Sequence, residues 1–433
     1  MDEVFSYVYF VSPGVLVAVS YYPGPNNHIL FNLLGALFNH FGGFLWEEPV
    51  WGMRLLSVWA SLGCSLIFFY WVYRLYNFKI AWWACLILNL QIPFFTYSIL
   101  GRGYMLQLFF LLLTMPLGLK LLAARQSTPS ANIIYVLGAS LGFYCIPTFL
   151  YPYFALTAFL FFWSFIDFNL LVFKRLLILN LQVIGLTILL YSPVIWLNGW
   201  KALSNNSWVA SLSWTDFWAG IPAYFEEISR FFWDDAGMVV GGLFIGLLGI
   251  YIFSVAQHKK IETRAAQSQV LMLFLIFAPA LPIFMQRVLP FPRVWMYLSI
   301  PISFIVIELG TYFFNKKENL ILGGFSFIQI LILVKVLWID YQTPVFQELA
   351  LKILAEQPKQ LFVNEDTYLT FIQYEAFKKK QKFDIETHNF QPTKAYSWII
   401  VYKGWVFPQE TNLSSYHLFK EDDLVKIYQN KLP

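Results

Sequence analysis

The sequence predicts an α-helical protein that crosses a membrane many times and carries a small α/β domain outside the membrane at its C-terminal end. Two observations lead to this fold class. Of the 433 residues, 58% are hydrophobic and only 12% are charged, whereas soluble domains contain roughly 25% charged residues. The charges are also uneven, because 11 lysines and 12 acidic residues lie in the last 95 positions. A cytosolic enzyme, a disordered chain and a nucleic-acid-binding protein are therefore excluded.

About ten segments are apolar over the length that a spanning helix needs, which is about 20 residues. The predicted spans are residues 54–76, 80–98, 103–122, 132–150, 153–172, 176–197, 238–256, 270–286, 295–313 and 320–338. Residues 29–45 are also apolar, but Asn39, His40 and two glycines interrupt them. We interpret this segment as a re-entrant or interfacial helix.

The basic residues of the loops predict the orientation of these spans, since cytoplasmic loops are enriched in lysine and arginine. One set of alternate loops carries Arg74, Lys79, Lys120, Arg125, Lys174, Arg175, Lys259, Lys260, Arg264, Lys316 and Lys317. The other set carries Arg54, Arg102, Lys201, Arg230, Arg287 and Arg293. The first set is predicted to be cytoplasmic. Residues 1–53, the loop 198–237 and the C-terminal domain 339–433 are then outside, and residues 54–338 form the transmembrane domain.

This orientation places the N-terminus outside the membrane. The sequence therefore predicts that a first helix, running from the cytoplasm to the outside, is missing before residue 1. The alternative is a short span over residues 4–19, which Pro13 and the absence of flanking positive charge disfavour.

The C-terminal domain alternates short β-rich segments with helical ones. We predict strands at 360–364, 384–387 and 397–402, and helices at 367–382 and 422–430. The run Lys378-Lys379-Lys380 is interpreted as a solvated helix end. No spacing of histidine, cysteine or acidic residues indicates a metal site or a bound cofactor, and the three cysteines lie in apolar segments.

Polar residues on the predicted outer side form the candidate site. Asp2 and Glu3 stand next to the N-terminus. A carboxylate there is suited to act as general base for an acceptor hydroxyl, although acids near an N-terminus are usually just solvated. The turn that follows ends in Asn27 and His28. His28 either binds phosphate or transfers a proton, or it caps an interfacial helix together with the asparagine.

Arginines form the other part of the candidate site. Arg102 and Tyr104 lie in a very short outer loop, in which the glycines on either side of Arg102 allow close approach of a ligand. Arg287 and Arg293 precede the span that begins at residue 295. A guanidinium offers a planar fork of donors that suits phosphate. Interfacial anchoring is the alternative interpretation of these arginines.

The loop 198–237 combines acidic residues with interleaved tryptophans, among them Trp208, Trp214, Trp218 and Trp233. This composition suits binding of carbohydrate, and it also suits an ordinary amphipathic surface helix. No single residue of this loop is assigned a role.

Five motifs of the outer side follow one another in chain order. They are Asp2-Glu3, Pro25-Asn26-Asn27-His28, Arg54-Leu55-Leu56-Ser57, Gly101-Arg102-Gly103-Tyr104 and Pro292-Arg293-Val294. Together they resemble the motifs of the polyprenyl-phosphate-sugar-dependent glycosyltransferases of the GT-C type, which include protein O-mannosyltransferases and the lipid A aminoarabinose transferase. The resemblance covers roughly residues 1–340. It departs from the family pattern at Phe5, where a basic residue is common, and at Val294, which replaces a tyrosine.

The resemblance implies a GT-C-like fold and an inverting sugar transfer on the outer (periplasmic) side of a bacterial inner membrane. A polyprenyl-phosphate-linked sugar would be the donor, and a glycan, a lipid or a protein the acceptor, among membrane lipids and without nucleic acid. Asp2, next to Glu3, would be the base. Arg102, Arg293 and His28 would bind the donor phosphate, with no metal ion or cofactor.

Two other functions remain open from the residues. A transporter or flippase of envelope glycolipids predicts ionisable residues near the bilayer midplane, and the spans have few of them. A glycan polymerase or ligase would use a histidine in a large outer loop, and the loop 198–237 has none.

Overall fold

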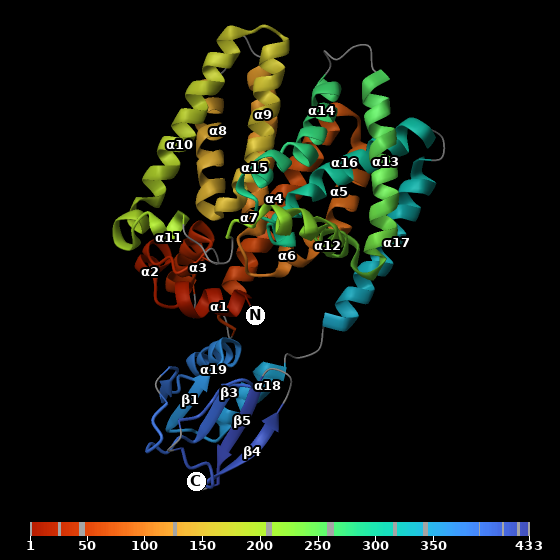
Figure 1. The fold of residues 1–433 in the computed structure, drawn as a ribbon. Helices are drawn as coiled ribbons and strands as arrows, with labels where there is room; N and C mark the ends of the chain where they lie inside the picture. The colour runs from red at the N-terminus through yellow and green to blue at the C-terminus, as the bar shows by residue number, and fades with distance from the viewer. Residues whose placement is uncertain are drawn as a thin grey trace.

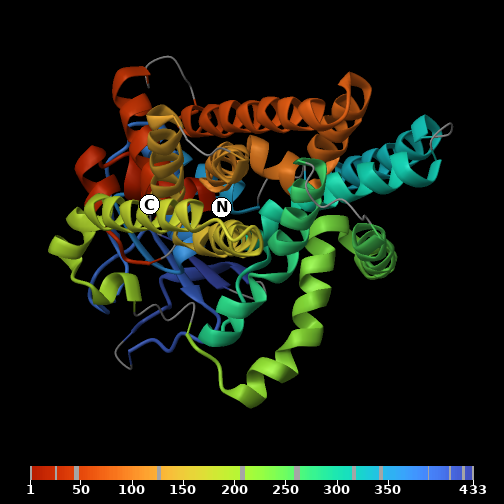
Figure 2. The same cartoon turned by 90° about the horizontal axis from the view of Figure 1, so that it is seen from above.

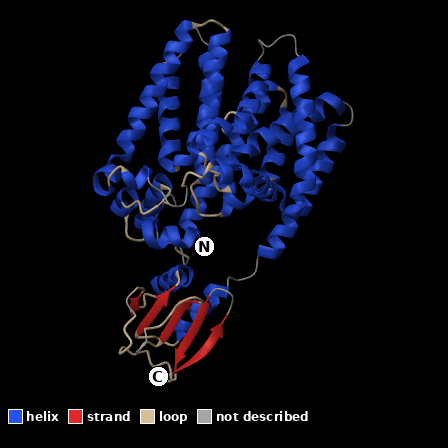
Figure 3. Cartoon of the chain, viewed as in Figure 1, coloured by secondary structure: helices blue, strands red, loops and turns tan. Residues whose placement is uncertain are grey.

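The computed structural model describes the chain in two connected parts, a helical bundle and a small sheet domain (Figure 1). The described residues are 2–24, 27–42, 48–123, 128–204, 210–257, 264–314, 318–340, 345–388, 390–408, 411–421 and 425–431. Helices make up the whole of the first part, and the strands are confined to the C-terminal part (Figure 3). The predicted fold class, a polytopic helical protein with a small C-terminal α/β domain, is confirmed.

Short helices precede the bundle and form its lower edge in Figure 1. They are α1 (Asp2–Ser6), the π-helix η1 (Tyr7–Val11), α2 (Val15–Ser20) and α3 (Ile29–Gly42). The segment that we interpreted as re-entrant or interfacial is thus a helix of 14 residues. Its neighbours are α2, α4, α8 and η1.

Apolar helices of 7 to 29 residues form the bundle. They are α4 (Trp51–Leu75), α5 (Phe78–Leu90), α6 (Ile92–Ile99), α7 (Tyr104–Ala123), α8 (Pro129–Cys145), α9 (Leu150–Ile166), α10 (Leu170–Asn198), α13 (Gly237–Gln257), α14 (Arg264–Phe277), α15 (Ala280–Gln286), α16 (Ser299–Phe314) and α17 (Glu318–Asp340). The elements between them are η3 (Pro147–Phe149), α11 (Lys201–Ser204), α12 (Trp214–Trp233), η5 (Asp234–Ala236) and η6 (Pro292–Leu298). Figure 2 shows the helices from above.

Seven helices among the described residues are long and apolar enough to cross a membrane, and eight if one bent pair is counted as a span. All ten predicted spans are largely helical, but α8 has only 17 residues and other segments are broken by short 3-10 turns or kinks. Composition located the helices, because a run of apolar residues is the signal that a membrane imposes. It did not locate the breaks within them.

The predicted span at 80–98 is helical, but it is bent. Helices α5 and α6 meet there at an angle of 70°. Gln91 has extended backbone torsions, and Pro93 stands in the first turn of α6, where its ring favours a new helix start. The Gln91 amide donates to the Ser299 carbonyl oxygen at 2.9 Å and to Ser303 Oγ at 2.6 Å, so these hydrogen bonds fasten the break to the start of α16.

The two ends of the bundle differ as the loop charges predict. The start of α10, with Lys174 and Arg175, lies at the end of the bundle opposite to α1 and the sheet domain (Figure 1). Lys120 is in the last turn of α7, which runs away from the outer-loop residue Arg102. The basic loops and the candidate site are therefore at opposite ends.

The C-terminal domain is a five-stranded sheet with two helices. Its elements are α18 (Val345–Ala355), β1 (Gln360–Asn364), α19 (Asp366–Lys378), β2 (Asp384–Glu386), β3 (Trp398–Tyr402), β4 (Tyr416–Glu421) and β5 (Val425–Asn430). The strand order is β2-β1-β3-β5-β4. The β1 strand pairs in parallel with β2 and β3, and β5 is antiparallel to β3 and β4.

The predicted helix at 422–430 is wrong, because residues 425–430 are strand β5. Val425 and Ile427 are buried with a period of two, opposite Tyr402 and Ile400 of β3. This segment is a strand because it pairs with β3, which is not adjacent to it in the chain. Helix α18 and strand β4 were not predicted from the sequence.

Helix α19 of the C-terminal domain packs against the N-terminal segment of the bundle. The Tyr7 ring of η1 meets the rings of Tyr374 and Phe377 edge-on, with centroid distances of 5.9 and 5.6 Å. Glu48 accepts hydrogen bonds from the Tyr374 hydroxyl at 2.8 Å and from Lys378 Nζ. The domain is thus attached directly beside the residues that carry the candidate site.

Candidate functional site

Four segments that are far apart in the chain meet at one end of the bundle. They are the start of α1, the residue before α3, the turn between α6 and α7, and the start of η6. Their polar side chains, Asp2, Glu3, His28, Arg102 and Arg293, form one connected group, which we call the outer cluster. The sequence predicted all five as site residues. Their contacts differ markedly, however, and the contacts decide what each can do.

Glu3 is buried, and its carboxylate has two hydrogen-bond partners. Its carboxylate accepts hydrogen bonds from Arg54 Nε at 3.1 and 3.2 Å and forms an ion pair with Arg54 Nη2. It also accepts from the Gly101 backbone N–H at 2.9 Å. A Cβ at Gly101 would lie 3.0 Å from Met53 Cβ and 3.3 Å from the Glu3 carboxylate, so the glycine allows this approach. Glu3 therefore fixes α1 to α4 and to the α6–α7 turn.

Asp2 is the accessible acid of the pair, with a side chain 45% exposed compared with 7% for Glu3. Its Oδ2 accepts a hydrogen bond from Arg293 Nη1 at 2.7 Å. The Arg102 Nη2 atom lies 3.8 Å from the same oxygen. Asp2 thus presents a carboxylate to solvent between two guanidinium groups.

Arg102 lies beneath Asp2 and is only 2% exposed. Its Nη1 donates to the Asp2 backbone carbonyl at 3.0 Å and to Ser6 Oγ at 2.6 Å. Ser57 Oγ donates to the Arg102 carbonyl oxygen at 3.3 Å, which ties the turn to α4. Arg293 is 31% exposed, so it is the guanidinium that a ligand reaches first.

His28 is buried against the same turn. Its Nδ1 accepts a hydrogen bond from the Gly103 N–H at 3.0 Å, and its Nε2 lies 3.3 Å from Arg102 Nη2. Burial, together with the positive charges of Arg102 and Arg293, holds the pKa of His28 well below its ordinary value. The ring is therefore neutral, and with Nδ1 as acceptor its proton is on Nε2.

Close packing explains Gly103 and Tyr104, the two residues that follow Arg102. A Cβ at Gly103 would come within 3.0 Å of His28 Cβ and of Cys145 Sγ, so a larger residue would push the ring away. Tyr104 packs edge-on against His28 with a centroid distance of 4.9 Å. Tyr104 thus belongs to the wall of the outer cluster, as its predicted place in the motif implies.

Two predicted site residues lie elsewhere. Asn27 is completely buried and donates to the carbonyl oxygens of Ala18 and Tyr21 at 3.2 and 2.7 Å. Its side-chain oxygen accepts from Asn32 at 2.8 Å, so Asn27 holds the turn in front of α3. The Arg287 guanidinium lies over the Trp214 ring of α12, 5.5 Å from its centroid. Both residues support the surrounding structure rather than the outer cluster.

The sequence reading missed two members of the site. Arg54 belongs to one of the five motifs, but the sequence does not indicate that it pairs with Glu3. Nothing in the sequence indicates a role for Ser6. The Glu3–Arg54 pair joins residues 51 positions apart. Only the resemblance motif that begins at Arg54 could have indicated it. Within the described residues, no group of three or more histidine, cysteine, aspartate or glutamate side chains is arranged to hold a metal ion.

Comparisons with known proteins add to this geometry. No family model matches the sequence, and no curated protein matches it either. Among solved structures, the chain is similar to ArnT from Cupriavidus metallidurans bound to undecaprenyl phosphate, with a TM-score of 0.62 and 10% identity over 99% of this chain and 92% of that one. The chain has the GT-C fold of ArnT. The apo form of ArnT, at 12% identity over the same shares of both chains, gives a TM-score of 0.47.

ArnT is a lipid A aminoarabinose transferase, a glycosyltransferase of the GT-C type. The likeness to ArnT extends over almost the whole of this chain, sheet domain included. At such low identity it concerns the path of the backbone. The chemistry of the outer cluster has to be argued from this chain's own residues.

Proposed function

We propose that this protein is a membrane glycosyltransferase that moves a sugar from a polyprenyl-phosphate donor to an acceptor hydroxyl of a glycan, lipid or protein. One observation carries the proposal: the exposed carboxylate of Asp2 lies between two arginines at one end of a bundle with the fold of ArnT. The charges of the loops favour the periplasmic side of a bacterial inner membrane for this end.

The donor phosphate is proposed to bind at Arg293. A phosphate approaching from solvent meets this half-buried guanidinium first and competes with Asp2 for it. Arg102 adds positive charge from below, and the Nε2–H of His28 faces the same guanidinium at 3.3 Å. Two donors that face each other are poorly matched, and an anion oxygen that approaches the pair from one side would accept from both.

The reaction follows from this arrangement. The acceptor hydroxyl oxygen attacks the anomeric carbon of the sugar and forms the new C–O bond. The bond from that carbon to the phosphate oxygen breaks, and the polyprenyl phosphate leaves with the electron pair. Asp2, released from Arg293 by the phosphate, takes the hydroxyl proton. The arginines stabilise the negative charge that grows on the departing phosphate.

Attack opposite to the leaving phosphate inverts the configuration at the anomeric carbon. In this proposal the Asp2 carboxylate and the Arg293 guanidinium flank the anomeric carbon, with the base on one side and the phosphate on the other. Glu3 has a positioning role, because its contacts with Arg54 and Gly101 fix the backbone of α1.

The transporter alternative receives less support. Helix α1, which carries Asp2 and Glu3 of the outer cluster, lies at the end of the bundle beside the C-terminal domain (Figure 1). A transport pathway needs ionisable groups near the membrane midplane.

A deletion strain complemented with variants tests the proposal. We expect the strain to lose one glycosylated envelope product, which the wild-type gene restores and Asp2→Asn does not, because the amide cannot accept the proton. Asp235→Asn is the matched control, since Asp235 is an exposed carboxylate paired with Lys335 away from the outer cluster. Full restoration by Asp2→Asn, at wild-type protein level, would exclude Asp2 as the base.

A further inference from the structure

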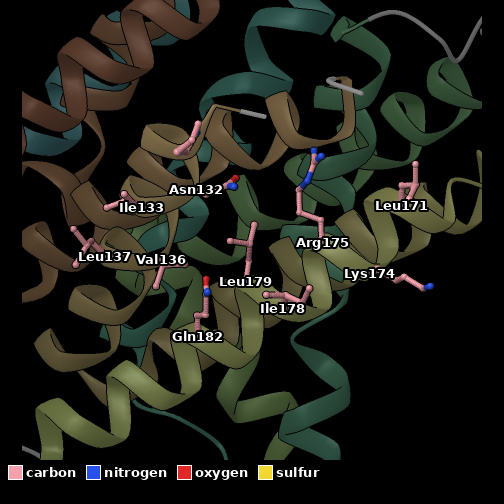
Figure 4. A pocket seen from close by; sticks show the side chains of 11 residues that line it. Asn132, Ile133, Val136, Leu137, Leu171, Lys174, Arg175, Ile178, Leu179 and Gln182 are labelled. Atoms are coloured by element: carbon pink, nitrogen blue, oxygen red, sulfur yellow. The ribbon is translucent and has the colours of Figure 1, made fainter. Parts of the chain in front are cut away.

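A cavity of about 640 Å³ lies on the side of the bundle, between α8 and α10. Figure 4 shows the residues that line it. Pro129, Asn132 and Val136 come from α8, and Arg175, Leu179 and Gln182 come from α10. The cavity is near the start of both helices, so it belongs to the end of the bundle away from Asp2 (Figure 1). We call it the basic groove.

The walls of the basic groove open toward the surroundings of the bundle. Ile133 and Ile178, one on each helix, are both more than half exposed, and Leu137 is 45% exposed. Both helices belong to the apolar bundle, and α10 meets the length and composition of a membrane span. These side chains therefore face lipid chains in a membrane, and the groove is accessible from within the bilayer.

Positive charge is concentrated at the shallow end of the groove. Helices α8 and α10 both begin here, and neither has an acidic residue in its first turn. The positive ends of two helix dipoles therefore remain uncompensated by those turns. Lys174 and Arg175 add two full positive charges to the lining. Asp167 precedes α10 but does not line the groove, so an anion fits this end by charge.

A polar group marks a deeper point on the same face. Gln182 lies seven residues after Arg175, which places it two turns along α10 on the same side, about 10 Å deeper into the membrane. Side-chain amides at such depth are disfavoured unless they find a hydrogen-bond partner. A ligand that fills the groove therefore needs an anion at one end and an acceptor oxygen below it.

We propose that the basic groove binds an anionic diacyl phospholipid. The phosphate lies beside the Arg175 guanidinium, with the charge of Lys174 next to it, and an ester carbonyl oxygen accepts a hydrogen bond from the Gln182 amide. The acyl chains run along Ile133 and Ile178. A polyprenyl phosphate has only hydrocarbon below its phosphate, so it leaves the glutamine without a partner. Basic pockets between helices on the cytoplasmic side are suited to anionic lipid headgroups in general.

Native mass spectrometry of the full chain in detergent tests this site. The probes are phosphatidylglycerol, zwitterionic phosphatidylcholine and undecaprenyl phosphate, each titrated separately. We expect phosphatidylglycerol to bind more tightly than phosphatidylcholine. The double variant Lys174→Gln/Arg175→Gln should weaken phosphatidylglycerol binding about 30-fold, since each basic residue contributes about 1 kcal/mol. Lys120→Gln, which removes a charge at the same end outside the groove, should change it less than twofold.

The variant Gln182→Leu separates the two kinds of lipid. We expect this variant to weaken the binding of phosphatidylglycerol and to leave the binding of undecaprenyl phosphate unchanged. Equal binding of phosphatidylcholine, or an equal effect of Lys120→Gln and the double variant, would overturn the proposal. Tighter binding of undecaprenyl phosphate that the double variant abolishes would assign the groove to the polyprenyl lipid instead. Thermal unfolding of each variant confirms that the helices are intact.

Discussion

Two adjacent carboxylates of the outer cluster have different environments. Asp2 is half exposed between two arginines, whereas Glu3 is buried with Arg54 and the Gly101 N–H. The resemblance implied Asp2 as the base, but nothing in the sequence indicated what Glu3 does, because the partners of Glu3 stand 51 and 98 positions further along the chain. Sequence motifs thus predict which residues meet. Only the three-dimensional contacts distinguish the exposed carboxylate from the one that holds the backbone.

Glu3 gives a prediction about stability. Glu3→Ala leaves the buried Gly101 N–H without its acceptor and removes a partner of Arg54, so we expect a loss of about 1–3 kcal/mol. Glu3→Gln keeps an acceptor oxygen and loses only the charge, and should cost less. Unfolding in SDS titrations measures both. Equal stability of Glu3→Ala and wild type would show that Glu3 does not fix α1.

His28 predicts a dependence of stability on pH. Its pKa is lowered in the folded protein, so below about pH 6.5 the unfolded chain binds a proton that the folded chain does not. Stability should therefore fall as the pH decreases below 6.5, by at most about 1.4 kcal/mol per pH unit. Arg102 and Arg293 are the charged groups that face the ring.

His28→Asn is the matched variant for this measurement. Its side-chain oxygen takes the place of Nδ1 and still accepts from the Gly103 N–H, but it does not titrate. The free energy of unfolding of this variant, measured between pH 5 and 7.5, should depend less steeply on pH, because the contribution of His28 is lost. A slope identical to that of wild type would assign the pH dependence to another group.

At the scale of helices and strands, the sequence predicted where most helices of the bundle lie along the chain, but not where they bend or how the strands pair. Apolar runs located the segments of the bundle, since hydrophobicity is a local property of the chain. The bend at Gln91 depends on a hydrogen bond to Ser303, 212 positions away, and β5 depends on pairing with β3. Neither partner is visible in a local window of sequence.

The bend between α5 and α6 gives a further prediction. Gln91→Leu keeps the size of the side chain and removes its hydrogen bonds to Ser299 and Ser303. We expect a loss of about 1 kcal/mol, the usual size of a polar contact between membrane helices. Ser98→Ala on α6 is the control, because the Ser98 hydroxyl bonds only within its own helix, to Phe95. Equal stability of the two variants would mean that the glutamine does not fasten the bend.

For the whole molecule, the decisive arrangement is the contact of the sheet domain with the N-terminal segment. The run of three lysines at the end of α19 looked like a solvated helix end in the sequence. In the structure the first of them, Lys378, is only 19% exposed and forms ion pairs with Glu48 and Glu375. Burial lowers the pKa of Lys378, but the hydrogen bond to Glu48 and the charges of both acids outweigh it and raise the pKa, so the lysine stays charged.

The last prediction concerns this docking. Lys378→Gln removes the charge that joins α19 to Glu48, next to the Tyr7 contact with Tyr374. We expect amide hydrogen exchange in η1 and α19 to accelerate about fivefold, because a half-buried ion pair contributes about 1 kcal/mol. Lys379→Gln is the matched control, since the neighbouring lysine is exposed. Exchange that accelerates equally in both variants would reflect net charge alone. Exchange that changes only in Lys378→Gln would show that the sheet domain holds the segment that carries Asp2 and Glu3.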